Sequence, residues 1–221
     1  MTRSYHQFCG VARALDVVGE RWTLLIIRDL LPGPLRFSDL LELEEGIGPN
    51  LLTQRLKNLE AHGVLEIRTL PPPGRARVYA LTELGMSLRD AVLALGRFGA
   101  TFMDRPGPSD RLHLGWAMFS LQRRFRGARE GGVVQVVSGE LAFVVSFTQE
   151  SLQVRRGLDD GADARIEGQM PAFGRWLSGA ATWRTVESAG GLAVSGRRSV
   201  VEALARAIAP RPPRIARGRD R

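Results

Sequence analysis

Hydrophobic residues in the first hundred positions recur mainly at helical spacing, with one short stretch of alternation. A dense apolar run predicts a helix over 19–31, which a Pro-Gly-Pro sequence brings to an end. A shorter pattern predicts a second helix over 36–43. Pro49 suits the first turn of a third helix over 50–62, which Gly63 would cap.

Alternating apolar residues follow these helices. They predict strands over 64–68 and 78–81, joined by a proline-rich basic turn over 71–77. Thr82 then has the character of an N-cap for a last helix that reaches about residue 103. This order of a short helix, a turn, an amphipathic helix and a hairpin is the plan of a winged helix-turn-helix domain.

The helix over 50–62 is the expected reading helix. Leucines on one stripe would hold it to the domain, so the opposite face points outward. That face carries Asn50, Thr53, Gln54 and Lys57, whose amide, methyl and ammonium groups match base edges in the major groove. The pattern therefore predicts sequence-specific contact with double-stranded DNA.

Other polar residues near this helix suit the DNA backbone. Arg36 and Ser38 start the preceding helix and could fix its register on phosphates. Arg55 lies at the edge of the reading helix, where either a phosphate contact or an internal ion pair fits. Arg75 and Arg77 on the hairpin suit phosphates or a narrow minor groove.

The second half of the chain has a different pattern. Helices are expected over 111–126, 171–178 and 200–208, and strands over 133–137, 141–147, 151–155, 164–167 and 192–195. Breaker-rich segments separate the parts. We therefore expect an α+β chain with domains at 1–104 and 111–209 and a basic tail at 210–221.

Charge adds little to the first half. The net charge is +8, but 13 basic and 12 acidic residues precede position 106, whereas 18 basic and 11 acidic residues follow. Charge alone is thus compatible with a polyanionic partner without identifying one. There is no secretory signal and no apolar run long enough for a membrane span, so we expect a cytoplasmic protein.

Catalytic and metal chemistry find no support in the motifs. The histidines at 6, 62 and 113 are scattered, and no nucleophile–base motif is present, so we expect no enzyme, metal or cofactor. Cys9 is the only cysteine, which rules out a disulfide within the chain. It is either a small buried apolar residue or a redox-sensitive thiol.

Residues 9–98 resemble the HxlR family of winged-helix regulators. The resemblance rests on the runs Arg-Trp-Thr-Leu-Leu-Ile-Ile-Arg-Asp-Leu at 21–30, Arg-Phe-Ser-Asp-Leu at 36–40, Leu-Thr-Gln-Arg-Leu-Lys-Asn-Leu-Glu at 52–60 and Tyr-Ala-Leu-Thr at 79–82. It implies a homodimer on a palindromic operator, with the first and last helices at the interface. The apolar surface of Leu84, Leu88, Leu95, Phe98 and Phe102 fits that interface or packing against the second half.

The second half resembles the sterol carrier protein type 2-like fold, on short matches at 164–168, 173–179 and 192–204. The resemblance implies an apolar ligand cavity between sheet and helices. Its candidate walls are Trp116, Phe119, Phe143, Phe147, Phe173, Trp176 and Trp183. Bulky aromatic residues also form ordinary cores, so both interpretations stay open.

Taken together, these features predict a transcriptional regulator whose operator affinity responds to a small apolar ligand in the second domain. Two alternatives remain. One is a redox-sensing regulator that acts through Cys9, and the other is an apolar-ligand carrier whose winged helix binds a protein.

Overall fold

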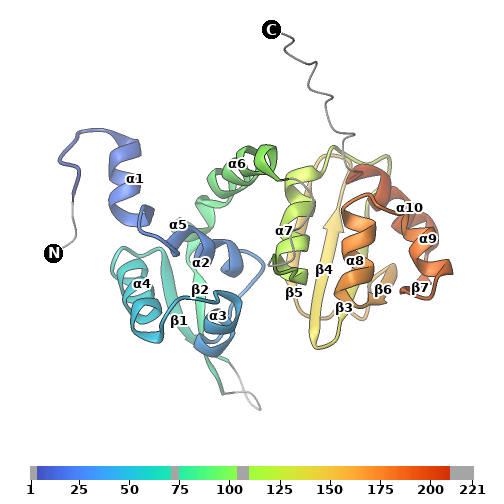
Figure 1. Cartoon of the computed structure of the whole chain (residues 1–221), viewed down its shortest axis with the longest axis horizontal. Helices are drawn as coiled ribbons and strands as arrows, with labels where there is room; N and C mark the ends of the chain where they lie inside the picture. Colours follow the sequence, from blue (N-terminus) through green and yellow to red (C-terminus); the bar gives the residue numbers. More distant parts are fainter. Residues whose placement is uncertain (1–3, 71–74, 104–109, 210–221) are drawn as a thin grey trace, which may run out of the picture. The chain divides into compact units, whose positions relative to one another are not determined.

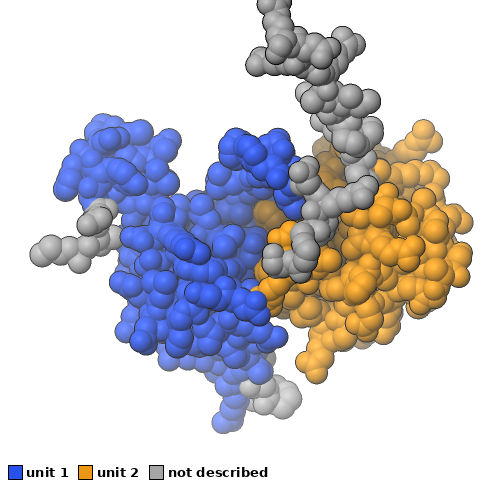
Figure 2. Space-filling view, in the orientation of Figure 1, with its two compact units in different colours: residues 1–105 blue, residues 106–221 orange. Residues whose placement is uncertain are grey.

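The chain forms two compact units, residues 1–105 and 106–221, which are coloured separately in Figure 2. The computed structural model describes residues 4–70, 75–103 and 110–209. Each unit has its own hydrophobic core and is described by itself.

The first unit is mostly helical with a small two-stranded sheet (Figure 1). Its elements are α1 (Gly10–Val18), α2 (Thr23–Leu30), α3 (Phe37–Leu43), α4 (Pro49–Ala61), β1 (Leu65–Thr69), β2 (Arg77–Leu81), α5 (Glu83–Ser87), α6 (Arg89–Gly99) and the 3-10 helix η1 (Ala100–Phe102).

The expected helix over 19–31 is wrong at its start. Gly19 lies at the C-terminal end of α1, where its amide donates to the Leu15 carbonyl at 2.9 Å. Trp22 then takes a left-handed backbone conformation with φ of 79°, which a continuous helix cannot accommodate. The helix therefore begins at Thr23, and α1 is a separate element.

The expected helix over 82–103 is also divided. Thr82 caps α5 as expected, since its Oγ1 accepts a hydrogen bond from the Gly85 amide at 3.1 Å. The Leu88 amide then donates to the Gly85 carbonyl, only three residues back, and this tight turn ends α5. The chain resumes as α6 and finishes in η1.

The hairpin pairs β1 with β2 in antiparallel register from Leu65 opposite Leu81 to Thr69 opposite Arg77. Leu35 forms a bridge to Tyr79 on the other edge of β2, with backbone hydrogen bonds of 3.1 and 2.8 Å. The hairpin is thus joined to the segment before α3, as the wing of a winged helix is.

The second unit is a five-stranded sheet in the order β5-β4-β3-β6-β7, in which β3 and β6 are parallel and the other pairs antiparallel. The strands are β3 (Gly132–Ser138), β4 (Leu141–Phe147), β5 (Leu152–Arg156), β6 (Ala164–Gly168) and β7 (Leu192–Gly196), and the helices are α7 (Leu114–Arg124), α8 (Met170–Leu177), α9 (Trp183–Ser188) and α10 (Arg198–Ala207). The α+β expectation is confirmed.

Helices α7, α8 and α10 lie over one face of this sheet (Figure 1), and the alternate strand residues that face them form the core. The chain must cross β4 and β3 to pass from β5 to β6. Gln135 of β3, 2 % exposed, holds that crossing segment, because its side chain donates to the Gly157 carbonyl and accepts from the Asp159 amide. Every polar atom of this buried amide group is thereby paired.

Strand and helix limits in this unit follow the sequence pattern to within a few residues, with one omission. The short helix α9 was not expected. Thr182 caps it by accepting from the Thr185 amide at 3.1 Å, and Trp183 is buried. A six-residue helix is too short to show an apolar period in the sequence.

Candidate nucleic-acid interface

Helix α4 has the two faces that its sequence predicts. Leu52, Leu56 and Leu59 are at most 2 % exposed and anchor the helix in the core of the first unit. Asn50, Thr53, Gln54 and Lys57 are all exposed on the other side. Pro49 occupies the first helical turn as expected. The polar face is therefore accessible along the N-terminal two turns, the part that enters a groove in helix-turn-helix proteins.

The hydrogen-bonding capacity of this face is largely unused. Across the part of the chain that the structure describes, the side chains of Asn50, Gln54 and Lys57 form no hydrogen bond or ion pair. Thr53 differs, because its hydroxyl donates to the Pro49 carbonyl at 2.8 Å. Its methyl group is left as the part that could meet a thymine methyl.

Arg55, expected at the DNA edge of the helix, is turned into the protein instead. Its Nε donates to the Arg21 carbonyl at 3.1 Å, and its Nη2 bonds to the Glu20 carboxylate at 2.9 Å. Only 12 % of the side chain is exposed. Of the two arrangements expected for Arg55, the internal ion pair is the one that forms. Arg55 therefore fixes α4 to the turn between α1 and α2.

The two residues at the start of α3 are exposed, as a phosphate contact requires. Arg36 occupies the N-cap position, and its backbone amide donates to the Asp39 carboxylate at 2.9 Å. The Ser38 hydroxyl lies 3.3 Å from the same carboxylate. Asp39 is therefore committed to the helix terminus.

The wing presents Arg75 and Arg77 to solvent, while residues 71–74 at its tip lie outside the described residues. Arg75 has a positive φ of 24°. Arg68 on the partner strand is already paired with Glu66. Arg75 and Arg77 are therefore the cations that this part of the wing offers to a phosphate.

The first unit also contains a buried network of ion pairs that the sequence analysis did not predict. Arg28 of α2 bonds to the neighbouring Asp29 at 2.9 and 3.1 Å and to Glu44, beyond α3, at 2.7 Å. Asp29 and Glu44 are at most 5 % exposed. The network joins α2 to the end of α3, the helix that precedes α4. Apolar periodicity gives no signal for such charged residues.

The seven aromatic residues expected around a ligand cavity are mostly core. Phe143, Phe147, Phe173, Trp176 and Trp183 belong to the central cluster of the second unit, and Phe119 is also buried. Trp116 is half-buried and lies over Arg111 and beside His113. Tight packing of these rings accounts for their burial without a ligand.

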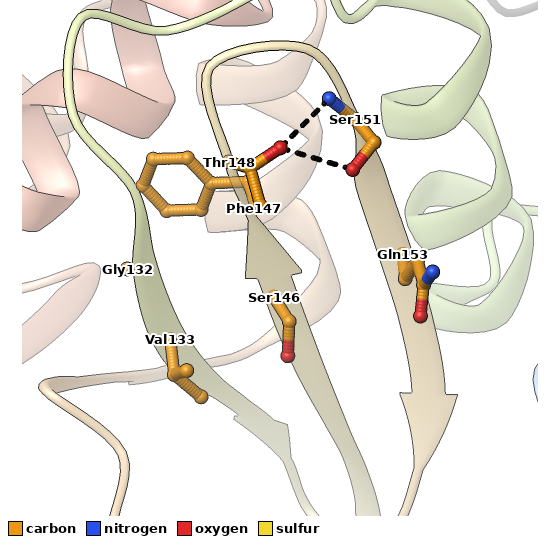
Figure 3. Close-up of a pocket in the computed structure, with 7 residues that line it drawn as sticks. All are labelled: Gly132, Val133, Ser146, Phe147, Thr148, Ser151 and Gln153. Carbon is orange, nitrogen blue, oxygen red and sulfur yellow. Dashed lines mark hydrogen bonds between the residues drawn. The ribbon is translucent and has the colours of Figure 1, made fainter.

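A pocket of about 340 Å³ lies elsewhere, across β3, β4 and β5 (Figure 3). Val133, Ser146 and Gln153 are cross-strand neighbours and project from the sheet side by side. Thr148 and Ser151 close one end through a 3.0 Å hydroxyl contact. Of the expected cavity walls, Phe147 alone is among its lining residues. The apolar-ligand site therefore stays a prediction.

Cys9 is exposed and immediately precedes α1. Hydrogen bonds from the backbone amides of Ala12 and Val11 lower the pKa of its thiol below the usual value. The thiolate is the reactive form of cysteine. The expectation of a buried apolar Cys9 is thus wrong, and a reactive thiol is the surviving interpretation.

No group of three or more His, Cys, Asp or Glu side chains in the described residues could hold a metal ion. Among the helices that the structure describes, none has the length and apolar character to cross a membrane.

Comparison with known proteins places the first unit. Residues 17–106 match the HxlR-like helix-turn-helix family profile. An uncharacterized HTH-type transcriptional regulator of Mycobacterium bovis is 38 % identical over 110 residues, which cover 48 % of this chain and 69 % of that protein. The regulator YodB of Bacillus subtilis is 38 % identical over 76 residues, 34 % of this chain and 68 % of YodB. The structure of reduced YodB covers 46 % of this chain and all of that one, at 30 % identity and a TM-score of 0.39.

These relatives are transcriptional regulators and not enzymes. Their extent corresponds to the winged-helix unit, whose reading helix, wing and capping residues are described above. The chain therefore belongs to the HxlR-like helix-turn-helix family of DNA-binding transcriptional regulators.

Proposed function

We propose that this protein binds a palindromic operator as a homodimer and reads its bases with Asn50, Gln54 and Lys57 of α4. The observation that carries the proposal is the combination of three buried leucines on one side of α4 with amide and ammonium groups on the other that have no partner among the described residues. These side chains break no hydrogen bond to another described residue when they bind bases. Arg36, Ser38, Arg75 and Arg77 would hold the phosphates.

The test begins with the full-length protein and random duplex DNA, from which bound sequences are selected to define the operator. The double variant Gln54→Ala with Lys57→Ala should then weaken operator binding by about 1–3 kcal/mol for each lost base contact. It should also relax the base preference at the matching positions. Fluorescence anisotropy at fixed salt measures both effects.

Two variants serve as controls. Glu60→Ala changes an exposed residue on the same helix beyond the proposed reading face and should leave base preference intact. Arg77→Ser should weaken operator and unrelated DNA alike, because a phosphate contact carries no sequence information. Unchanged operator preference in the Gln54→Ala, Lys57→Ala variant would contradict the proposal and favour a winged helix that binds protein.

A second candidate function, regulation by oxidants through Cys9, is favoured by the exposure of this thiol and its lowered pKa. With one cysteine in each chain, a disulfide between cysteines of this protein would have to join two protomers. An oxidant should then change the operator affinity of the wild-type protein and leave Cys9→Ser unaffected. An equal response of the two proteins rejects this mechanism.

Control by an apolar effector in the second unit is the remaining part of the proposal. The sheet with helices on one face is compatible with such a role, but the aromatic core is closely packed, so a ligand that entered it would have to displace side chains. An effector acts only through different affinities for two states. Equal operator affinity with and without a saturating lipid extract, at matched salt, would exclude it.

A further inference from the structure

The first two turns of α4 carry a small apolar area beside their polar residues. Pro49 and Thr53 are both exposed and lie four residues apart, so they are neighbours on the helix surface. Asn50 and Lys57 lie three residues before Thr53 and four after it, so they border the same area. We call Pro49 and Thr53 the apolar pair.

The apolar pair has no free hydrogen-bond donor. The Thr53 hydroxyl donates to the Pro49 carbonyl at 2.8 Å. Because the hydroxyl is held there, the Cγ2 methyl is the other terminal group of the Thr53 side chain. Proline has no backbone N–H, and its ring is hydrocarbon. The pair therefore differs from Gln54 and Lys57, whose donors have no partner among the described residues.

The major groove of DNA presents few apolar groups. Its base edges carry hydrogen-bond donors and acceptors, and the C5-methyl of thymine is the apolar group among them. A helix that enters the groove with its N-terminal residues brings the first two turns close to base edges. A C5-methyl placed against the apolar pair is removed from water, and the contact breaks no hydrogen bond of Thr53.

We infer that Thr53 is a further specificity-determining residue, which recognises a pyrimidine C5-methyl group in the operator through its own methyl group. The inference rests on the proposed function, since it requires α4 to lie in the major groove. Thymine and 5-methylcytosine both carry the C5-methyl. A single buried methyl group changes affinity by about fourfold, so this contact refines a base preference that the polar residues of α4 establish.

The test uses the full chain and the operator obtained by selection, in which each thymine is replaced in turn by deoxyuridine. This replacement removes the C5-methyl alone. Thr53→Ser keeps the hydroxyl and loses the methyl, whereas Thr53→Val keeps a methyl and loses the hydroxyl. Thr185→Ser removes the same methyl from an exposed position of α9 in the second unit and is the control. Fluorescence anisotropy at fixed salt measures the affinities.

We expect deoxyuridine at one position of each half-site to weaken binding by about fourfold per half-site for wild type, Thr53→Val and Thr185→Ser. Thr53→Ser should bind the thymine operator more weakly by the same factor and should not respond to deoxyuridine at that position. A C·G pair placed there should bind wild type about fourfold more tightly when its cytosine carries a C5-methyl. No gain from this methyl would assign the contact to thymine alone.

Equal responses of wild type and Thr53→Ser to deoxyuridine at every position would overturn the inference. A loss of thymine preference in Thr53→Val would also overturn it, because the hydroxyl would then be the contacting group. The Gln54→Ala, Lys57→Ala variant tests the proposed function separately. If that variant loses base preference while wild type binds every deoxyuridine operator as tightly as the thymine operator, the inference fails and the proposed function stands.

Discussion

Three arginines of this chain have different structural roles. Arg28 is held between two buried carboxylates, Arg55 joins the reading helix to a neighbouring turn, and Arg124 binds two helix ends. In each case the guanidinium serves several acceptors at once, which the ammonium group of a lysine does less well. A lysine at any of these three positions would keep the positive charge but would serve the several acceptors less well.

Asp163 offers a pH-dependent test at this scale. Its carboxylate accepts from the Val133 amide at 2.9 Å and pairs with Arg197, and both contacts lower its pKa. A carboxyl whose pKa is lower in the folded state stabilises the fold above its unfolded pKa, and this stabilisation is lost as the pH falls through the folded value. Asp163→Asn should therefore be less stable than wild type at pH 7, with a difference that shrinks towards pH 3.

Thermal unfolding of both proteins at the two pH values measures this difference. Glu140→Gln, an exposed position without a partner among the described residues, is the matched control and should show no such convergence. A stability difference for Asp163→Asn that is constant from pH 7 to pH 3 would show that the carboxylate charge has no part in stability.

Among the elements, α5 depends on a close approach between its backbone at Gly85 and the hairpin. A Cβ atom at Gly85 would lie 2.0 Å from the Val64 carbonyl oxygen and 3.0 Å from Leu81. This position is buried, and the obstructing atom belongs to the backbone, so neither side can move cheaply. Only glycine lets α5 pack against the hairpin here.

Gly85→Ala should therefore lower the free energy of unfolding of the first unit by about 2 kcal/mol or more. Gly99→Ala is the matched control, because a Cβ atom there meets nothing within 4 Å, and alanine at a helical position stabilises by about 0.5–1 kcal/mol. Denaturant titration measures the change in the free energy of unfolding. Hydrogen exchange of the hairpin amides assigns that change to the first unit. Equal stability of the two variants would contradict the close approach.

Local sequence signals predicted the elements whose capping residues and apolar periodicity lie within the element itself. Pro49, the leucine stripe of α4 and Thr82 are examples, and the outward residues of α4 followed from the stripe. Features set by distant contacts could not be predicted in this way. The orientation of Arg55 depends on Glu20, 35 positions earlier, and the crossing from β5 to β6 depends on Gln135. The left-handed Trp22 also has no local signature.

At the scale of the whole molecule, two apolar faces of the first unit are left uncovered. Val11 and Leu15 are exposed on α1, and Phe8, just before the helix, is also exposed, at spacings of three and four. Leu84, Leu95, Phe98 and Phe102 are exposed along the segment from α5 to η1. The spacing of the residues at α1 is visible in the sequence. Apolar area of this extent is typical of a protein interface.

We expect these faces to form the proposed homodimer. Leu95→Glu with Phe98→Glu should convert a dimer into a monomer in analytical ultracentrifugation and weaken operator binding, since one monomer engages one half-site. Leu158→Glu changes an equally exposed leucine of the second unit and should leave the dimer intact. A dimer that persists in the double variant would place the interface elsewhere.

The bonds of Arg55 have a mechanical consequence. They tether the reading helix to the turn that ends α1, and α1 would also meet the second protomer. A shift of α1 would be transmitted through these hydrogen bonds to the exposed side chains of α4 that we propose contact the bases. The distance between the two α4 helices of the proposed dimer could then change without any ligand near the DNA. Arg55→Ala should remove this coupling between α1 and α4.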